Sequence, residues 1–263
     1  MTTGTATGGA GRVAGRARRG RAFGKLLQTE GKLAWRTPFG LGLGVVIPAF
    51  FLFIIGSVPA MRQPGPGTLT QFGAFIPVLI GMSLALIALI ALPIPLVLNR
   101  DRGVLRRFAT TPVAPSWLLA AQVVVNLALA LMAIVIIVAG GALFFGVRLP
   151  SQPAGFVLSV LLAIAAMFAI GLLIAALCPS AAVAGAVGTV VLYPLLFFSG
   201  LWTPTADMSP FLRRLSGFTP LNAAVQAMRD AMQGTFPPAR PLLVLAACAV
   251  ICGALAVRYF RWQ

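Results

Sequence analysis

The sequence predicts an all-α protein that is integrated in a membrane. Of its 263 residues, 59% are hydrophobic and only 9% are charged, and the mean hydropathy is +0.98. A soluble domain carries about 25% charged residues, so this composition excludes one. Six apolar runs are long enough to cross the hydrocarbon core as helices, which takes about 20 residues each. The runs lie near 39–60, 74–98, 117–146, 154–177, 181–201 and 240–258.

These six runs define one integral domain with a short tail at each end. We expect a disordered basic tail over 1–21, a six-span transmembrane domain over 22–258 and a cytoplasmic tail over 259–263. The first run starts at Phe39 and is long enough to span, so no cleavable signal peptide is expected. With the N-terminus inside, the inner segments hold fourteen of the twenty Lys and Arg residues. This asymmetry predicts that both termini are cytoplasmic.

Residues 22–36 have the pattern of a separate amphipathic helix. Apolar residues recur there at helical spacing: Phe23, Leu26, Leu27, Leu33 and Ala34. Basic and polar residues occupy the opposite side, and Trp35 suits the headgroup layer, so we expect an N-terminal helix in the cytoplasmic interface. A poorly ordered basic segment is the alternative, because Gly24 and Gly31 weaken a helix.

Proline and small residues shape the later spans. Pro93 and Pro95 fall near the end of the second run, where they kink a helix and set the angle of the segment that follows. Pro179 separates the fourth run from the fifth. Ala184 and Gly188 are four residues apart in the fifth run, a spacing that lets membrane helices approach closely.

The segment 202–239 is too long to be a bare connection before the last run. Ser209 with Pro210, and Thr219 with Pro220, are start signals for two short helices. Apolar stripes follow both signals, and Gly234 ends the second. We therefore expect a helical pair at the outer membrane surface, or dipping into it.

The segment 99–112 concentrates charge between two apolar runs. Five ionised side chains lie within 99–107, and hydrocarbon cannot hold them, so this stretch must leave the bilayer. Asp101 stands where a helix N-terminus favours negative charge, and Pro112 ends the helix. Its apolar side chains then share one face: Val104, Leu105 and Phe108. Such a helix fits a groove in a soluble partner, whereas the alternative is a positively charged anchor that contacts no protein.

The residues that the chain lacks exclude several kinds of chemistry. It has no histidine, and its four acidic residues lie outside the six runs: Glu30, Asp101, Asp207 and Asp230. Ion-coupled carriers normally need ionisable groups at membrane depth, so this distribution argues against a self-powered carrier. Near Lys25 and Lys32 the glycine spacing and hydroxyl of a phosphate-binding loop are missing, so we expect no ATP site. Cys248 and Cys252 share a helix face, but no third ligand is near, so we expect no metal site.

Three segments, in their order along the chain, resemble type-2 ABC transporter permeases, the family of bacterial drug, polysaccharide and lipid exporters. Residues 99–115 resemble the loop that follows the second span in this family. That loop has the pattern acidic-x-Gly-x-Leu-basic and ends in Pro. Residues 197–204 resemble its Ser-Gly-x-x-x-Pro signature, and 208–229 resemble its outer helical pair. Two departures are that Asp101 replaces a frequent Glu, and that the turn at 178–180 carries no charge.

The resemblance implies a permease subunit of an ATP-driven exporter in the bacterial plasma membrane. The implied partners are a second permease chain and nucleotide-binding ATPase subunits, which would hold ATP–Mg²⁺, while this chain would be no enzyme and hold no cofactor. Residues 99–112 would form the cytoplasmic coupling helix. Its expected contact residues are Asp101, Gly103, Leu105, Arg106 and Phe108. Ser199 and Gly200 would line the substrate path, with kinking or packing as their alternative role.

The apolar spans, which contain few charged residues, favour an amphipathic or hydrophobic cargo. A drug-like molecule is the leading expectation, which would make the chain part of an antibiotic-resistance efflux system, and a lipid or lipid-linked glycan is the other. The basic tail suits membrane lipid rather than nucleic acid, since no aromatic platform accompanies it. Two further classes stay open, an ion-gradient-driven secondary carrier and a non-transporting membrane immunity or scaffold protein. Homodimer or heterodimer, and export or lipid flipping, also stay open.

Overall fold

The chain folds into a bundle of helices, and its described residues contain no β-strand. The computed structural model describes residues 42–65, 67, 69–101, 115–205 and 207–259. The α-helices are α3 (Ile47–Ser57), α4 (Gln71–Leu86), α5 (Pro93–Asp101), α7 (Pro115–Phe145), α8 (Pro153–Leu177), α9 (Ala181–Phe198), α10 (Pro210–Ser216), α11 (Pro220–Met232) and α12 (Ala239–Tyr259). A 3₁₀-helix covers Pro59–Arg62, and π-helical turns cover Gly42–Val46 and Ile87–Ala91.

Among the residues that the structure describes, five helices are long and apolar enough to cross a membrane. They are Gln71–Asp101, Leu119–Phe145, Pro153–Leu177, Ala181–Phe198 and Ala239–Tyr259. They coincide with five of the six expected runs, so the chain is a multi-pass membrane protein. The first expected run, 39–60, corresponds to the shorter apolar helix Gly42–Ser57, so the count of six spans stays a prediction. The expected tail at 1–21, the interfacial helix at 22–36 and most of 99–112 lie outside the described residues.

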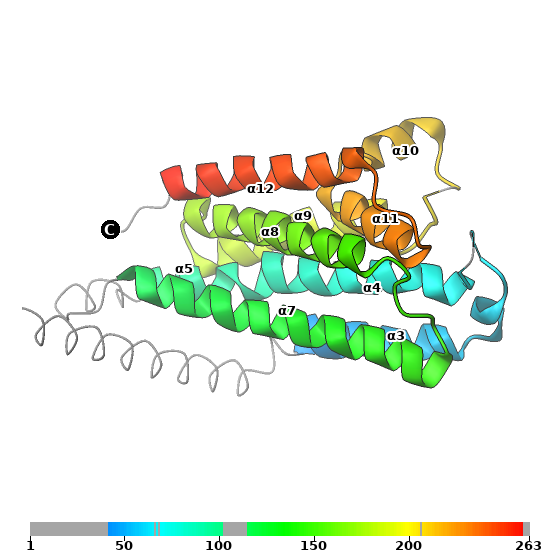
Figure 1. Cartoon of the computed structure of the whole chain (residues 1–263). Coiled ribbons are helices and arrows are strands. Elements are labelled where there is room, and N and C mark those ends of the chain that lie inside the picture. The colour runs from blue at the N-terminus through cyan, green and yellow to red at the C-terminus, as the bar shows by residue number, and fades with distance from the viewer. Residues whose placement is uncertain (1–41, 66, 68, 102–114, 206, 260–263) are drawn as a thin grey trace, which may run out of the picture.

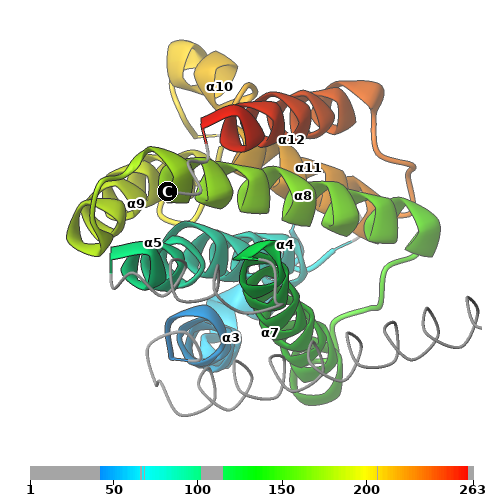
Figure 2. The same cartoon turned by 90° about the vertical axis from the view of Figure 1, so that its left-hand side faces the viewer.

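Successive long helices alternate in direction along the bundle (Figure 1). One end of the bundle therefore gathers Asp101, the turn at 178–180 and the C-terminal end of α12. The opposite end gathers the connections 58–70 and 146–152 with α10 and the start of α12. Seen from the first of these ends, the continuous helix α4–α5 runs through the middle, with α3, α7, α8 and α9 around it (Figure 2).

The helix Gln71–Asp101 is the most enclosed of the five candidate spans. Within its most apolar window 94% of residues are buried, against 11% for α12. A span enclosed on all sides must be apolar all round, and large side chains such as Leu79, Leu84 and Leu89 are fully buried. The exposed faces of the outer helices are also rich in large apolar side chains, as a lipid-facing surface requires.

The middle of this central helix contains the π-helical turn Ile87–Ala91. The N–H of Leu92 donates to the carbonyl of Ile87 at 2.9 Å, which is the wide spacing of a π-turn. Pro93 follows and has no N–H, so the carbonyl of Leu89 lacks its usual helical partner. Pro93 and Pro95, which were expected to kink this span, therefore lie just after a widened helical turn.

The two short helices expected before the last span are α10 and α11. Ser209 caps α10, because its hydroxyl oxygen accepts a hydrogen bond from Leu212 N–H at 3.4 Å, and Gly234 follows α11 with a φ of +93°. However, α11 does not lie flat on the surface, because it packs against α8, α12 and α4. Its buried alanines are small enough to let it enter the bundle: Ala223, Ala224, Ala227 and Ala231.

Candidate functional site

Arg100 joins the end of α5 to the end of α8. Its guanidinium donates one hydrogen bond to the carbonyl of Ala175 at 3.3 Å and another to the carbonyl of Cys178. These carbonyls belong to the last turn and cap of α8, where helical partners are missing. A cation is favoured there because the helix dipole is negative at its C-terminus.

Asp101 joins the same end of α5 to the start of α9. One of its carboxylate oxygens accepts a hydrogen bond from the N–H of Ala181 at 3.2 Å. Ala181 is the first residue of α9, so this N–H has no partner within its own helix and the positive end of the dipole favours an anion. Asp101 is thus the last residue of α5, and its negative charge supports the N-terminus of α9.

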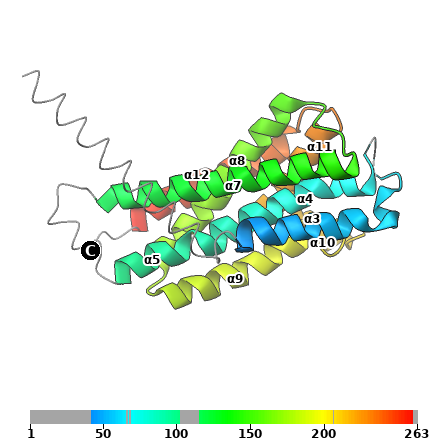
Figure 3. The same cartoon turned by 90° about the horizontal axis from the view of Figure 1, so that it is seen from below.

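We call these contacts of Arg100 and Asp101 with the ends of α8 and α9 the α5–α8–α9 junction. Figure 3 shows α5 and α9 side by side at this end of the bundle. The turn at 178–180 carries no charge of its own, and burial raises the pKa of the Cys178 thiol while Arg100 lowers it by less, so this thiol stays neutral. The junction therefore brings one positive and one negative charge from α5 to a turn that has none.

A cavity of about 600 Å³ lies towards the opposite end, between the start of α4, the segment after α9, and α11. Its apolar walls include Phe75, Leu201 and Trp202, and its polar groups include Asp207 and Arg229. Mostly apolar walls with a few fixed polar groups are typical of sites for small molecules.

We call this cavity, at the end away from the junction, the outer cavity. Arg229 is its fixed cation. Its Nε and Nη2 both donate to the carbonyl of Ala74, at 3.3 and 3.0 Å, which ties α11 to the first turns of α4. Burial lowers the pKa of Arg229 from its ordinary value, but a guanidinium remains protonated at neutral pH. This role of Arg229 could not be predicted from the sequence, because a basic residue on a short amphipathic helix is ordinarily solvated.

Comparison with known families identifies the architecture that carries this junction and cavity. The family model of the ABC-2 type transporter matches residues 21–232, which is most of the chain. The chain belongs to the ABC-2 type transporter family. A comparison with curated proteins gave no match.

The ABC-2 type transporter domain is a transport subunit and is not itself catalytic. Its family match ends at residue 232, the last residue of α11, and so includes the junction, the lining residues of the outer cavity and every described helix except α12. Permeases of this family usually work with an ATPase subunit. No group of three or more His, Cys, Asp or Glu that could hold a metal occurs among the residues the structure describes.

Three of the seven site residues expected in this ABC-2 transporter lie in the described part of the chain. Asp101 is in the junction, and Gly200, with a φ of +87°, lines the outer cavity. Ser199 is 1% exposed, and its hydroxyl donates to the carbonyl of Leu196 at 2.7 Å, so its polar group is used within α9. The other four lie outside the described residues: Gly103, Leu105, Arg106 and Phe108.

Proposed function

We propose that this chain is the membrane-spanning permease subunit of an ATP-driven exporter, powered by a separate ATPase subunit. The observation that carries the proposal is the α5–α8–α9 junction. Arg100 and Asp101 lie at the start of the segment 99–112 that the resemblance assigns to the ATPase contact. A push on that segment would therefore reach the ends of α8 and α9 as well as α5.

The proposed topology has six crossings with both termini in the cytoplasm of a bacterial cell. Gly42–Ser57 would belong to the first crossing, since this apolar helix lies beside α4 and runs in the direction opposite to α4–α5. In this topology the junction end is cytoplasmic, residues 22–36 form an interfacial helix, and α10 and α11 are the outer helical pair. The tail at 1–21 would meet anionic headgroups.

The proposed cargo is an amphipathic or hydrophobic molecule, with a drug-like compound as the first choice and a lipid or glycan as the second. The outer cavity supports this choice, because Phe75 and Trp202 offer apolar walls while Arg229 and Asp207 can orient one polar group. Gly200 would contribute to the exit of this path, and Ser199 would act on it only through packing. A second permease chain would cover some of the outward apolar face of α9 or α12.

Substitutions at the junction test the proposal. Arg100→Gln should leave the complex with the ATPase intact but lower substrate-stimulated ATP hydrolysis, because α5 loses its contact with the end of α8. Asp101→Asn should also lower hydrolysis, and it should weaken the complex as well, because Asp101 is one of the expected ATPase-contact residues. Phe108→Ala and Arg106→Glu should weaken the complex itself. The matched control is Arg148→Gln, which removes one positive charge at the opposite end.

The measurements are co-purification of the full chain with the candidate ATPase and ATP hydrolysis in proteoliposomes. Unchanged complex formation and unchanged hydrolysis in all four variants would contradict the coupling role. Transport by the purified chain alone, driven by an ion gradient, would instead support a secondary carrier. Absence of ATP-dependent flux with an active ATPase present would support a scaffold or immunity protein.

A further inference from the structure

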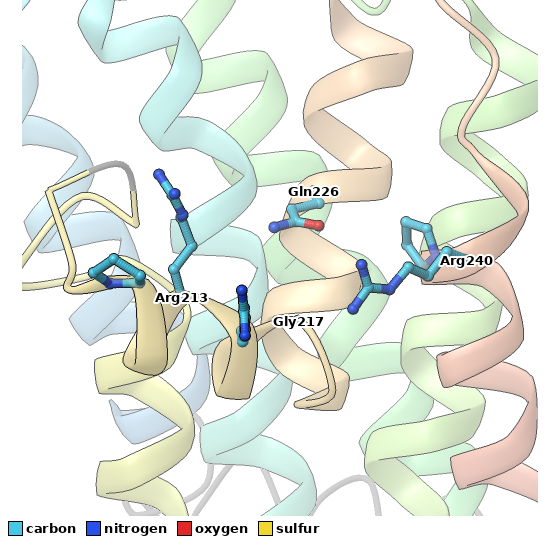
Figure 4. A pocket seen from close by; sticks show the side chains of 7 residues that line it. Arg213, Gly217, Gln226 and Arg240 are labelled. Carbon is cyan, nitrogen blue, oxygen red and sulfur yellow. The ribbon is translucent and has the colours of Figure 1, made fainter.

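A second cavity, of about 340 Å³, lies at the end of the bundle opposite the junction. It opens between α10, α11 and α12, and its lining includes three arginines: Arg213, Arg214 and Arg240. Figure 4 shows Gln226 of α11 and Arg240 of α12 pointing towards one another across this space. None of the described residues that line it is acidic. We call it the arginine pocket.

The place of Arg240 in its own helix argues that this charge has a function. Arg213 and Arg214 lie in the last turn of α10, where the helix dipole favours cations. Arg240 lies in the first turn of α12, where the dipole disfavours them. Its guanidinium carbon lies 5.3 Å from the centre of the Phe218 ring, a cation–π contact that holds it towards α10.

The end of α10 cannot neutralise the three arginines. A helix C-terminus supplies only about half a negative charge. The carbonyls of that end also have partners already, since Arg213 O accepts from Gly217 N–H and from the Ser216 hydroxyl. Three full positive charges from two helices thus face one space that lacks a described carboxylate, which is the electrostatic signature of an anion site.

The surroundings of the arginine pocket suit a lipid rather than a free ion. Phe211, Leu215 and Phe218 of the α10 region and Leu243 of α12 are exposed, with Phe211 exposed at 74%. Apolar side chains can meet acyl chains, while guanidinium groups bind phosphate oxygens in bidentate fashion. The combination places a phosphate site beside an apolar surface at the level of one membrane leaflet.

We propose that the arginine pocket binds the phosphate group of an anionic membrane lipid, whose acyl chains lie along the exposed apolar side chains of α10 and α12. This site lies apart from both the junction and the outer cavity, and lipid binding there needs no ATP. The proposal therefore goes beyond the proposed function, and its measurement contains no ATPase.

The test is native mass spectrometry of the purified full chain in detergent micelles, titrated with phosphatidylglycerol. Arg240→Gln should weaken lipid binding about tenfold, the loss expected for one charge-assisted hydrogen-bonding group. Arg148→Gln, which removes an exposed arginine at the same end but outside the pocket, should leave binding unchanged. Equal losses in the two variants would overturn the proposal, because they would reflect general surface charge.

Gly217→Ala tests the same site without removing any charge. A Cβ at this position would lie 3.3 Å from Nη2 of Arg240, so it should disturb the guanidinium and weaken binding of phosphatidylglycerol. Unchanged lipid binding in both Gly217→Ala and Arg240→Gln would overturn the site.

Inorganic phosphate is the second probe and distinguishes the source of the phosphate group. We expect it to compete only weakly, since it gains nothing from the apolar surface beside the pocket. Binding of inorganic phosphate as tight as that of the lipid would overturn the assignment to a membrane lipid.

Discussion

At the scale of single residues, two glycines allow α8 and α9 to touch the backbone of the central helix. A Cβ on Gly171 would lie 1.9 Å from the carbonyl oxygen of Ala88, and one on Gly188 would lie 2.1 Å from that of Leu89. Both carbonyls belong to the π-helical turn Ile87–Ala91, one of them left without its helical partner by Pro93. Close approach of backbone to backbone is a principal source of helix association in membranes.

Gly171→Ala should therefore destabilise the folded chain by about 3 kcal/mol, because a backbone carbonyl cannot move aside as a flexible side chain does. Gly253→Ala is the matched control, since a Cβ there meets nothing within 4 Å on a helix that is also a candidate span. The measurement is thermal unfolding of the purified variants in detergent. Equal melting temperatures for the two variants would show that the contact of Gly171 with Ala88 is unimportant.

A single carboxyl group should make stability depend on pH. Burial raises the pKa of Asp230 above its ordinary value, and the neighbouring Arg229 lowers it by less. The folded chain thus holds this proton more strongly than the unfolded chain does. The contribution of Asp230 to stability is therefore greatest below the pKa of this carboxyl in the unfolded chain, about 4. It is lost as the pH rises through the higher pKa of the folded chain.

Asp230→Asn should accordingly raise the melting temperature at neutral pH by about 2 °C, since it also removes a negative charge from the last turn of α11. The difference from the unsubstituted chain should shrink as the pH is lowered towards about 4, where the carboxyl is protonated. Melting curves across this range measure the effect. If the difference in melting temperature between the two proteins grew as the pH was lowered, the predicted direction of the pH dependence would be wrong.

At the scale of elements, the start of α9 depends on a residue of α5. Ser180 caps α9 through its hydroxyl, which accepts from Val183 N–H at 3.4 Å, and Asp101 supplies the second acceptor, for Ala181 N–H. Asp101→Ala removes that acceptor. Loss of such a cap costs about 1 kcal/mol, so amide exchange at the start of α9 should become about fivefold faster.

Hydrogen–deuterium exchange, read by mass spectrometry of peptides over 178–184, measures this cap. The start of α8, which lies at the opposite end of the bundle, is the internal control and should exchange at its usual rate. Faster exchange at both helix starts would indicate general loosening instead of a lost cap. Unchanged exchange at both would mean that Asp101 does not support α9.

The limits of most long helices could be predicted because hydropathy and proline act locally. The second run was expected at 74–98 and is found at Gln71–Asp101, and Pro179 does separate α8 from α9. The burial of α11 was harder to predict from the sequence, because its composition is that of a surface helix. Only its packing against α8 shows that it lies inside the bundle. The resemblance singled out Asp101 as an expected contact residue, but its partner Ala181 is distant in the chain and has no polar side chain that would suggest this contact.

At the scale of the whole molecule, hydropathy could not indicate which span is central. All the long runs are similarly apolar, and only their mutual packing encloses α4–α5 and leaves α12 at the periphery. The outer cavity was likewise invisible in the sequence, because it joins Phe75, Trp202 and Arg229 from three separate segments. The predicted orientation, in contrast, rests on the Lys and Arg residues counted in the segments between the spans.

That orientation leads to a prediction about the two ends of the bundle. After replacement of the three native cysteines (Cys178, Cys248 and Cys252), single cysteines are introduced at Val104, three residues after Asp101, and at Leu149, in the connection 146–152 at the other end. Leu149 is exposed and lies outside the arginine pocket, so a cysteine there should react in intact cells with a maleimide that cannot cross the membrane. A cysteine at Val104 should react only after the cells are lysed, because the four arginines within 99–107 favour the cytoplasmic side. The reverse pattern would put the junction outside the cell, where no ATPase could act on it, and would exclude the proposed transport cycle.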